Sequence, residues 1–301
     1  MFFRNAFITL SLFFSNPLIA LADFSEADFP IFPELKVDSR EMTEIIRKGI
    51  INKFKVQKIA DNSLKIKSAK NGPSQEVLNN YTQLKMTGDC RGCIIVNINL
   101  PNIELAGDLA DSTLSFSNLS GANINPVTSF QNTYMYGINL SNSKFTSVKF
   151  YNVVLDRADL SKSDASNAVF IGSSLYGADL REANLRRTKF NSINLRGANL
   201  SRTSLNGADF KDTNLKAADL SNINASGISF KNCILSHTNF SGAKLDGAVF
   251  INTDLTGANL QVKSMTEIFL DPHNNILCET KLPWGIDNSG CGRVYNGNKN
   301  F

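Results

Sequence analysis

Few side chains in this 301-residue chain could carry out catalysis. It contains two histidines, His237 and His273, and five cysteines. Asp and Asn are interchangeable as acceptors of backbone hydrogen bonds in turns, but not as acids and bases. A mixed series of the two recurs every twenty residues, so we expect a structural ladder rather than a catalytic, metal or cofactor site, and a protein that is not an enzyme: Asp159, Asp179, Asn199, Asp219, Asn239 and Asn259.

The element that must position these residues is a repeat. Large apolar residues fill every fifth position, as at Leu195, Leu200 and Leu205. A period of five fits neither an α-helix nor a β-strand, so the chain must turn after each block. Phenylalanine returns at every fourth block, which indicates a solenoid with four blocks per coil. The expected stacked core is Phe130, Phe150, Phe170, Phe190, Phe210, Phe230 and Phe250.

Each block reads as a small residue, then Asn or Asp, then Leu or Phe, as in Ala178-Asp179-Leu180. In this pattern the chain resembles the pentapeptide-repeat family, with an unbroken register from Phe130 to Met265. The resemblance implies an all-β solenoid, a right-handed quadrilateral β-helix with four pentapeptide repeats per coil. We place this β-helix at residues 89–265, after a small, mainly α-helical segment at 23–88 and before a C-terminal cap at 266–301.

The alternation of side chains along an extended block predicts which positions face inward. The central Leu or Phe and the residue two before it point into the tube, so the earlier residue must be small, as at Ala158 and Ala218. Cys233 occupies this small inward position and is expected to be a buried free thiol. A six-residue gap between Ile124 and Phe130 interrupts the register, and we expect residues 125–128 to protrude there.

The first 22 residues are typical of a secretory signal peptide. A short positive start containing Arg4 precedes an apolar run, and Ala20-Leu21-Ala22 forms the cleavage motif. The run is shorter than the roughly 20 residues that span a bilayer, so we expect an exported protein, periplasmic or extracellular. Beyond it, apolar spacing predicts one helix starting near Ser39 and a second from about Ser74 to Gly88.

Four of the five cysteines flank the repeat. Cys90-Arg91-Gly92-Cys93 resembles the lead-in of exported pentapeptide-repeat proteins, which implies a structural thiol pair or a disulfide. A redox-active pair is the alternative, but no thioredoxin-like alternation of strands and helices surrounds it. Cys278 and Cys291 resemble the C-terminal cap of the same proteins, which implies a disulfide. Trp284, the single tryptophan, is expected to plug that cap, because the end of a solenoid must be covered.

Outward positions carry the candidate binding residues. An apolar strip beside the phenylalanine ladder contains Tyr151, Val169, Ile171, Val249 and Ile251, beside Lys211 and Lys231, and could bind a partner or pair two tubes. The alternative for the charged residues is that they are ordinary solvated surface charge and bind nothing specific. Six cations fall within little more than one coil and should wrap around the tube, and we call them the basic belt: Arg181, Arg186, Arg187, Lys189, Arg196 and Arg202.

Three classes of function fit this pattern. We favour an exported, non-enzymatic scaffold or binding module that engages a protein or an anionic envelope component, or forms a homodimer through an exposed side or end. A DNA mimic that inhibits a topoisomerase, as the resemblance allows, would need acidic faces, whereas the formal net charge is +4, and we expect no nucleic-acid partner. A β-helix enzyme acting on polysaccharides would need a groove lined with acids, which a narrow, short-sided tube lacks.

Overall fold

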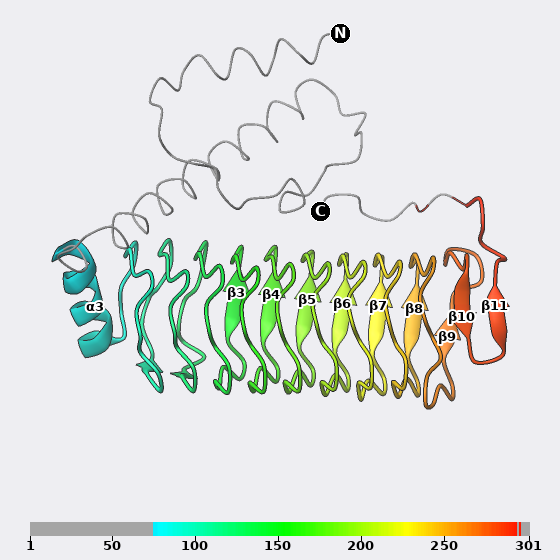
Figure 1. The fold of residues 1–301 in the computed structure, drawn as a ribbon, viewed down its shortest axis with the longest axis horizontal. Coiled ribbons are helices and arrows are strands. Elements are labelled where there is room, and N and C mark those ends of the chain that lie inside the picture. Colours follow the sequence, from blue (N-terminus) through cyan, green and yellow to red (C-terminus); the bar gives the residue numbers. More distant parts are fainter. Residues whose placement is uncertain (1–74, 294, 296–301) are drawn as a thin grey trace, which may run out of the picture. The chain divides into compact units, whose positions relative to one another are not determined.

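The computed structural model describes residues 75–293 and residue 295. The described residues all belong to one of two units of the chain, the one that begins at Val56. They form one helix, α3 (Gln75–Thr87), followed by a solenoid of short strands (Figure 1). The predicted signal peptide and the predicted helix near Ser39 lie outside the described residues.

The largest sheet of the solenoid has seven parallel strands, each one coil after the last. Successive strands pair in a twenty-residue register, so Phe150 lies beside Phe170 and Phe190 beside Phe210. A shorter parallel pair, β1 (Glu104–Leu105) and β2 (Asn123–Ile124), precedes it. The strands of the large sheet are β3 (Lys149–Tyr151), β4 (Val169–Ile171), β5 (Lys189–Asn191), β6 (Asp209–Lys211), β7 (Ser229–Lys231), β8 (Val249–Ile251) and β9 (Phe269–Leu270).

The tube has four sides, which we call A to D in chain order. Side A carries the phenylalanine ladder and the large sheet, and sides B, C and D are centred on Leu175, Leu180 and Leu185 in one coil. On sides B to D neighbouring coils meet through single parallel bridges with the same twenty-residue register, such as Asp159 with Asp179 on side C. The prediction of a quadrilateral β-helix with four blocks per coil is therefore confirmed.

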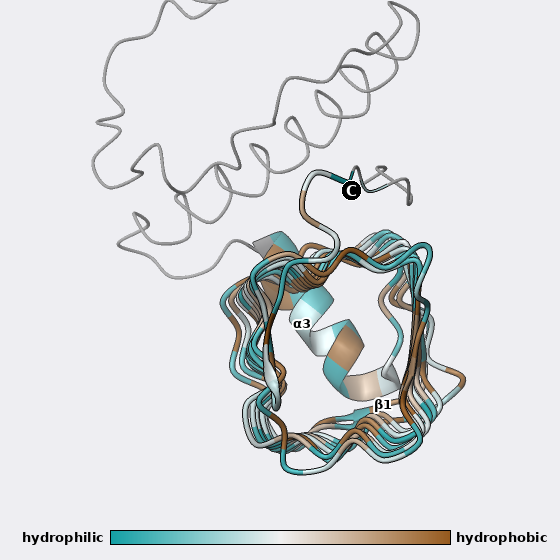
Figure 2. Cartoon of the chain, turned by 90° about the vertical axis from the view of Figure 1, so that its right-hand side faces the viewer, coloured by the Kyte–Doolittle hydropathy of each residue, from teal (hydrophilic) through white to brown (hydrophobic). Residues whose placement is uncertain are grey.

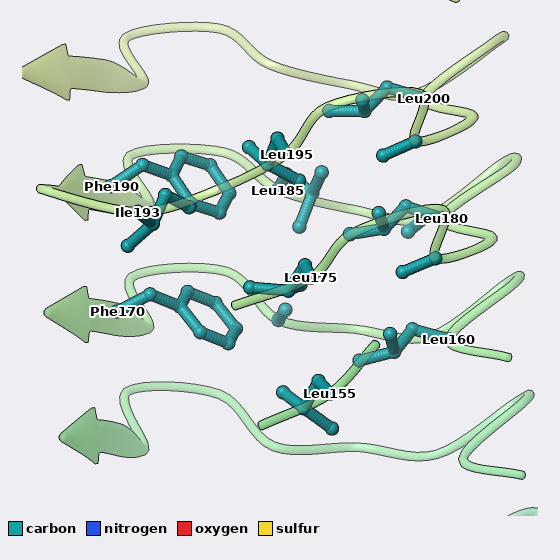
Figure 3. Close-up of a cluster of buried hydrophobic side chains, with 14 of the residues drawn as sticks. Leu155, Leu160, Phe170, Leu175, Leu180, Leu185, Phe190, Ile193, Leu195 and Leu200 are labelled. Carbon is teal, nitrogen blue, oxygen red and sulfur yellow. The ribbon is translucent and has the colours of Figure 1, made fainter. Parts of the chain in front are cut away.

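The core of the tube is a column of stacked side chains (Figure 3). The ring of Phe190 lies between those of Phe170 and Phe210, with centroids 5.4 and 4.5 Å apart and nearly parallel planes. The seven predicted phenylalanines are all buried, each at 2% exposure or less. Each buried large side chain contributes roughly 1.5 to 3 kcal/mol, and the column extends through every coil, so the solenoid needs no other core.

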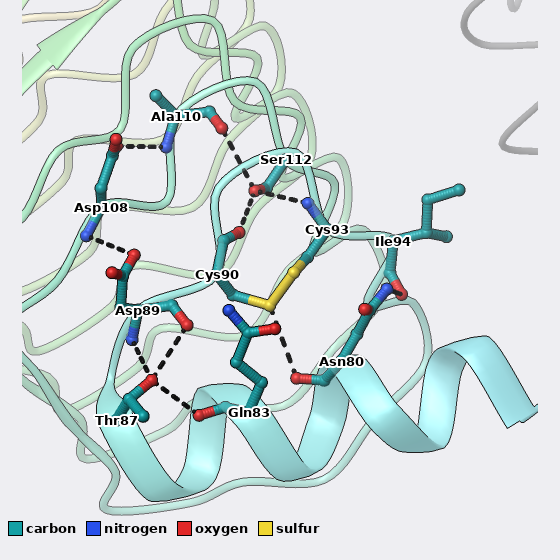
Figure 4. Close-up of a disulfide and its surroundings, with 10 residues drawn as sticks. All are labelled: Asn80, Gln83, Thr87, Asp89, Cys90, Cys93, Ile94, Asp108, Ala110 and Ser112. Atoms are coloured by element: carbon teal, nitrogen blue, oxygen red, sulfur yellow. Dashed lines mark hydrogen bonds between the residues drawn. A yellow bond between two sulfur atoms is a disulfide. The ribbon is translucent and has the colours of Figure 1, made fainter.

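Helix α3 closes the N-terminal opening of the tube, as a view along the tube shows (Figure 2). Leu84 and Val77 turn towards the core and are buried, and the helix ends where the Gly88 N–H bonds the Leu84 carbonyl at 2.9 Å. This matches the predicted second helix. Immediately after it, Cys90 and Cys93 form a disulfide against the helix (Figure 4).

The first coils carry the predicted irregularity in register. β1 and β2 are nineteen residues apart, whereas Asp108 pairs with Ser129, twenty-one residues later. The extra residue is accommodated after Ile124, where Val127 is 73% exposed. Thr128 does not protrude as predicted, because its side chain is buried and its hydroxyl donates to the Leu105 carbonyl at 2.9 Å.

Coil geometry continues beyond the sequence repeat at the C-terminal end. β9 pairs with β8, Leu277 packs against the core on side B, and Leu282 is buried on side C. The chain then turns into an antiparallel hairpin of β10 (Thr280–Leu282) and β11 (Gly285–Asp287), and Cys278 and Cys291 form the disulfide that the resemblance implied. Trp284 lies in the hairpin turn and is 69% exposed. The expectation that it plugs the tube is wrong, because the apolar residues of the added coil already fill that position.

Candidate binding surface

The basic belt lies on all four sides of the tube. Arg181 follows the centre of side C and Arg186 that of side D, while Lys189 precedes the centre of side A and Arg196 follows that of side B. Arg187 and Arg202 occupy corners, with left-handed backbone φ values of 56° and 60°. All six side chains are exposed. The five-residue repeat thus distributes six nearby cations around the tube instead of stacking them on one face.

Two members of the belt are partly neutralised. The Arg181 guanidinium forms an ion pair with the Asp179 carboxylate at 2.6 Å. Burial of Asp179 opposes its ionisation, but hydrogen bonds from the side chain and backbone of Arg181 outweigh this and hold its pKa below the usual value. Arg202 lies 3.9 Å from Glu182, at the edge of ion-pair distance.

The other four cations of the belt make no ion pair within residues 75–293. They are Arg186, Arg187, Lys189 and Arg196. The stem of Arg187 lies along the corner above Gly207, where a β-carbon would be 3.6 Å from its Cγ. Because these charges are exposed to water, dissolved salt screens their attraction for anions, and any binding through them should weaken as the salt concentration rises.

The apolar strip on side A is interrupted by charge. Val169 and Ile171 on β4 and Val249 and Ile251 on β8 are half-buried on the outer face of the sheet. Three strands with polar or charged outer residues separate the two pairs, among them Lys211 on β6 and Lys231 on β7. The strip is therefore two small patches.

The Asp and Asn ladder on side C is built into the backbone. In each block a side-chain oxygen accepts a hydrogen bond from the backbone N–H two residues later: Ser161 to Asp159, Ser201 to Asn199 and Ser241 to Asn239, at 2.9 to 3.1 Å. The predicted structural role of the ladder is confirmed. Within the described range, no group of three or more His, Cys, Asp and Glu residues could hold a metal.

Sequence reasoning missed a row of aromatic residues on side B. Tyr134, Tyr136 and Tyr176 occupy outward positions there, and Phe116 is 52% exposed at the adjoining corner. The available signal was compositional, because three of the six tyrosines of the chain share one side over three coils.

The comparisons with known proteins agree with the fold. Residues 143–220 and 163–240 match the family model described as pentapeptide repeat region, and residues 226–261 match that for pentapeptide repeats in eight copies. The chain is a pentapeptide-repeat protein. No protein with a curated description matches it significantly.

Several solved structures share the solenoid. HetL, a pentapeptide-repeat protein from the cyanobacterium Nostoc sp. strain PCC 7120, is 25% identical with a TM-score of 0.57, covering 71% of this chain and 99% of its own. Rfr23 from the cyanobacterium Cyanothece 51142 is 24% identical with a TM-score of 0.21, covering 57% and 98%. Full-length QnrB1, a plasmid-mediated fluoroquinolone resistance protein, is 16% identical with a TM-score of 0.32, covering 65% and 92%. Rfr23 and QnrB1 superpose too weakly to support an argument.

These neighbours are repeat proteins, and no catalytic family is indicated. A separate observation concerns membranes. Within the described range, no helix is long and apolar enough to cross a bilayer.

Proposed function

We propose that the protein is an exported, non-enzymatic scaffold whose basic belt binds a protein or an anionic envelope component. The observation that carries the proposal is the set of four exposed cations, Arg186, Arg187, Lys189 and Arg196, without an ion-pair partner in the described range. They are held on a tube whose core is fully packed. A rigid surface loses little conformational entropy on binding, which favours affinity.

Export is supported by the cysteines. Four of the five form two disulfides, Cys90–Cys93 and Cys278–Cys291, as is usual in oxidising compartments. HetL is described as involved in the regulation of heterocyst differentiation, and a regulatory role of this kind is compatible with binding through an outer surface. N-terminal sequencing of the protein recovered from the cell envelope should give a first residue close to Asp23.

The belt is tested by replacing Arg186, Arg187 and Arg196 together with Gln. A matched control removes three exposed cations elsewhere: Lys231, Lys244 and Lys281. Both triple variants lower the net charge equally, so any difference between them reports position. Surface substitutions usually change stability by less than about 0.5 kcal/mol each, and both variants should fold.

Binding is measured by cosedimentation with vesicles containing phosphatidylglycerol and by site-specific photocrosslinking in the envelope from position 192, where the exposed Ser192 lies among the belt residues but is not one of them. The belt variant should lose vesicle binding at low salt and its crosslinked partner, while the control variant keeps both. If both variants lose binding equally, binding depends on the net charge of the protein and not on the position of the belt. If neither variant loses binding, the belt is not the binding surface, and the apolar patches of side A become the candidate.

A further inference from the structure

Side B near the N-terminal end of the tube has an outer surface unlike the other sides. Going from coil to coil, its outward row reads Tyr136, Asp156, Tyr176 and Arg196. Side A also has apolar residues on its outer face, but there they lie beside Lys211 and Lys231, whereas on side B two tyrosines stand in one column. Aromatic rings left half-exposed on a rigid surface are typical of recognition sites, since they offer large contact area with few rotatable bonds.

The aromatic residues hold one another in place. The ring of Phe116 packs edge-on against Tyr136, with centroids 5.4 Å apart and planes at 69°. Phe116 lies over the corner glycine of the next coil, where a β-carbon at Gly137 would be 3.1 Å from its Cδ1. The ring of Tyr136 is therefore supported before any ligand arrives.

A polar floor separates the two tyrosines. The Asp156 carboxylate accepts hydrogen bonds at Oδ1 from the Ser174 hydroxyl and from the Tyr176 N–H, the latter at 2.9 Å. Its Oδ2 makes no hydrogen bond to any residue from 75 to 293. The stem of Arg157 lies alongside, over Gly177, with its Cγ 3.9 Å from where a β-carbon would be. The row thus alternates ring, acceptor and ring, with an exposed cation beside it.

We propose that this row binds an extended β-(1→4)-linked polysaccharide, with Tyr136 and Tyr176 each stacking on a sugar ring and Oδ2 of Asp156 accepting a hydroxyl between them. The two tyrosines are two coils apart, which is about 10 Å at the usual strand spacing. In a β-(1→4)-linked chain each sugar is turned over relative to the last, so equivalent faces recur at every second sugar. Two rings separated by two coils can contact such equivalent faces.

The chemistry of the row favours a sugar over other chain-like ligands. A nucleic acid would place phosphates next to the Asp156 carboxylate. A proline-rich peptide has a similar repeat, about 9 Å per turn of polyproline helix, but its rings offer no hydroxyl to an acceptor such as Oδ2. A sugar presents an apolar face to each tyrosine and hydroxyls to Asp156. The row adjoins the basic belt at Arg196, and a neutral polysaccharide distinguishes binding to the row from binding of an anion to the belt.

The test uses the full mature chain, with cellohexaose and chitohexaose in calorimetry and hydroxyethylcellulose and glycol chitin in affinity electrophoresis. At least one hexaose should bind, and its disaccharide should bind more weakly because it cannot span both rings. Tyr136→Ala and Tyr176→Ala should each weaken binding roughly 3- to 10-fold, as expected for loss of one stacked ring. Tyr176→Phe should retain most of the affinity, since it keeps the ring.

Tyr151→Ala is the matched control, because Tyr151 is also exposed, at 38%, but lies on side A. It should bind the hexaose as the unchanged protein does, and thermal melts establish that every variant is folded. The proposal is overturned if neither polymer retards the protein, or if Tyr151→Ala loses as much affinity as Tyr176→Ala. Binding of a decaproline peptide in place of the hexaoses would also overturn it and assign the row to peptides.

Discussion

The imidazole of His237 fills the space that a β-carbon at Gly257 would need. A β-carbon built on Gly257 would lie 2.6 Å from Nδ1 of His237, one coil earlier in the same corner. The same relationship links Asn152 to Gly172, where the corresponding distance to the amide oxygen is 2.5 Å. At these two corners a large side chain leans along the tube, and the next coil has glycine. Corner glycines therefore have two roles, a left-handed backbone and room for a neighbour.

We predict that Gly257→Ala destabilises the protein more than Gly197→Ala. Both glycines have φ near +65°, so each alanine should cost about 1 to 2 kcal/mol in backbone strain. No atom lies within 4 Å of a β-carbon at Gly197, whereas at Gly257 the clash with His237 should add about 1 to 3 kcal/mol. Denaturant unfolding measures both changes. In the His237→Ala background the added cost should disappear, and an unchanged cost would show that the imidazole is not responsible.

The interior of the tube could be predicted from the sequence because every interior position must hold an apolar or small side chain that packs on the same position of the next coil. Seven phenylalanines at a fixed spacing can stack only if the chain completes one coil in twenty residues, and no outward residue enters that argument. The caps could not be predicted in the same way. The single tryptophan, Trp284, is expected to plug the tube, but the coil after Met265 supplies Leu277 and Leu282 instead. Each lies twenty-two residues after its equivalent, Leu255 or Leu260, so neither falls on the twenty-residue period of the repeat.

Two substitutions in the middle of the tube test the packing of the interior. Phe190→Ala should cost about 3 to 5 kcal/mol, because it leaves a cavity between the rings of Phe170 and Phe210. Ala198→Leu should cost about 1 to 3 kcal/mol through overpacking, since Ala198 is buried beside the central leucines. Stability to guanidinium chloride checks both values. Tolerance of both changes would contradict the inward orientation of these residues.

Binding residues at outward positions were harder to predict, because the repeat does not restrict which residue types occur there. The basic belt was visible as a run of charge near Arg187. The aromatic row was not, because Tyr136 and Tyr176 are forty residues apart in sequence and become neighbours only through the coil register. A site on a solenoid is therefore better sought by reading the sequence in columns of twenty than along the chain.

Cys233 should be unreactive in the native protein. Burial raises the pKa of its thiol to about 12, so almost no thiolate exists at neutral pH. A thiol reagent should therefore detect no free thiol in the folded chain and one after unfolding without reductant. Detection of more than one thiol would show that a disulfide is absent.

The site of Cys233 is that of a small hydrogen-bond donor. Its thiol lies 3.4 Å from the carbonyls of Phe210 and Lys231, and the hydroxyl of Thr213 donates to the equivalent carbonyls one coil earlier. Cys233→Thr should therefore change stability by less than about 1.5 kcal/mol. Cys233→Phe is the contrasting variant, and it should prevent the coil from closing because the position has no room for a large ring.

Two aspartates share one bonding pattern but should respond oppositely to pH. Asp156 on side B and Asp246 on side D each accept from a serine hydroxyl and from a backbone N–H of the next coil. Burial raises the pKa of Asp156. Asp246 is half-buried as well, but hydrogen bonds from Ser264 and Thr266 lower its pKa to about 2.

The sign of each effect follows from linkage. The lowered pKa of Asp246 means that its carboxylate stabilises the fold above about pH 3.8, and this contribution is lost as the pH falls towards 2. The raised pKa of Asp156 means that its carboxylate opposes folding at neutral pH, and this cost diminishes as the pH falls through the raised value. Asp246→Asn should therefore lower stability at pH 7, whereas Asp156→Asn should preserve or raise it, because the amide oxygen can still accept from the Tyr176 N–H. Both differences from the unchanged protein should shrink in acid. Urea unfolding at pH 7 and between pH 4 and 2 measures them, and a loss of equal size in both variants at pH 7 would contradict the distinction between a carboxyl whose pKa is raised by burial and one whose pKa is lowered by hydrogen bonds.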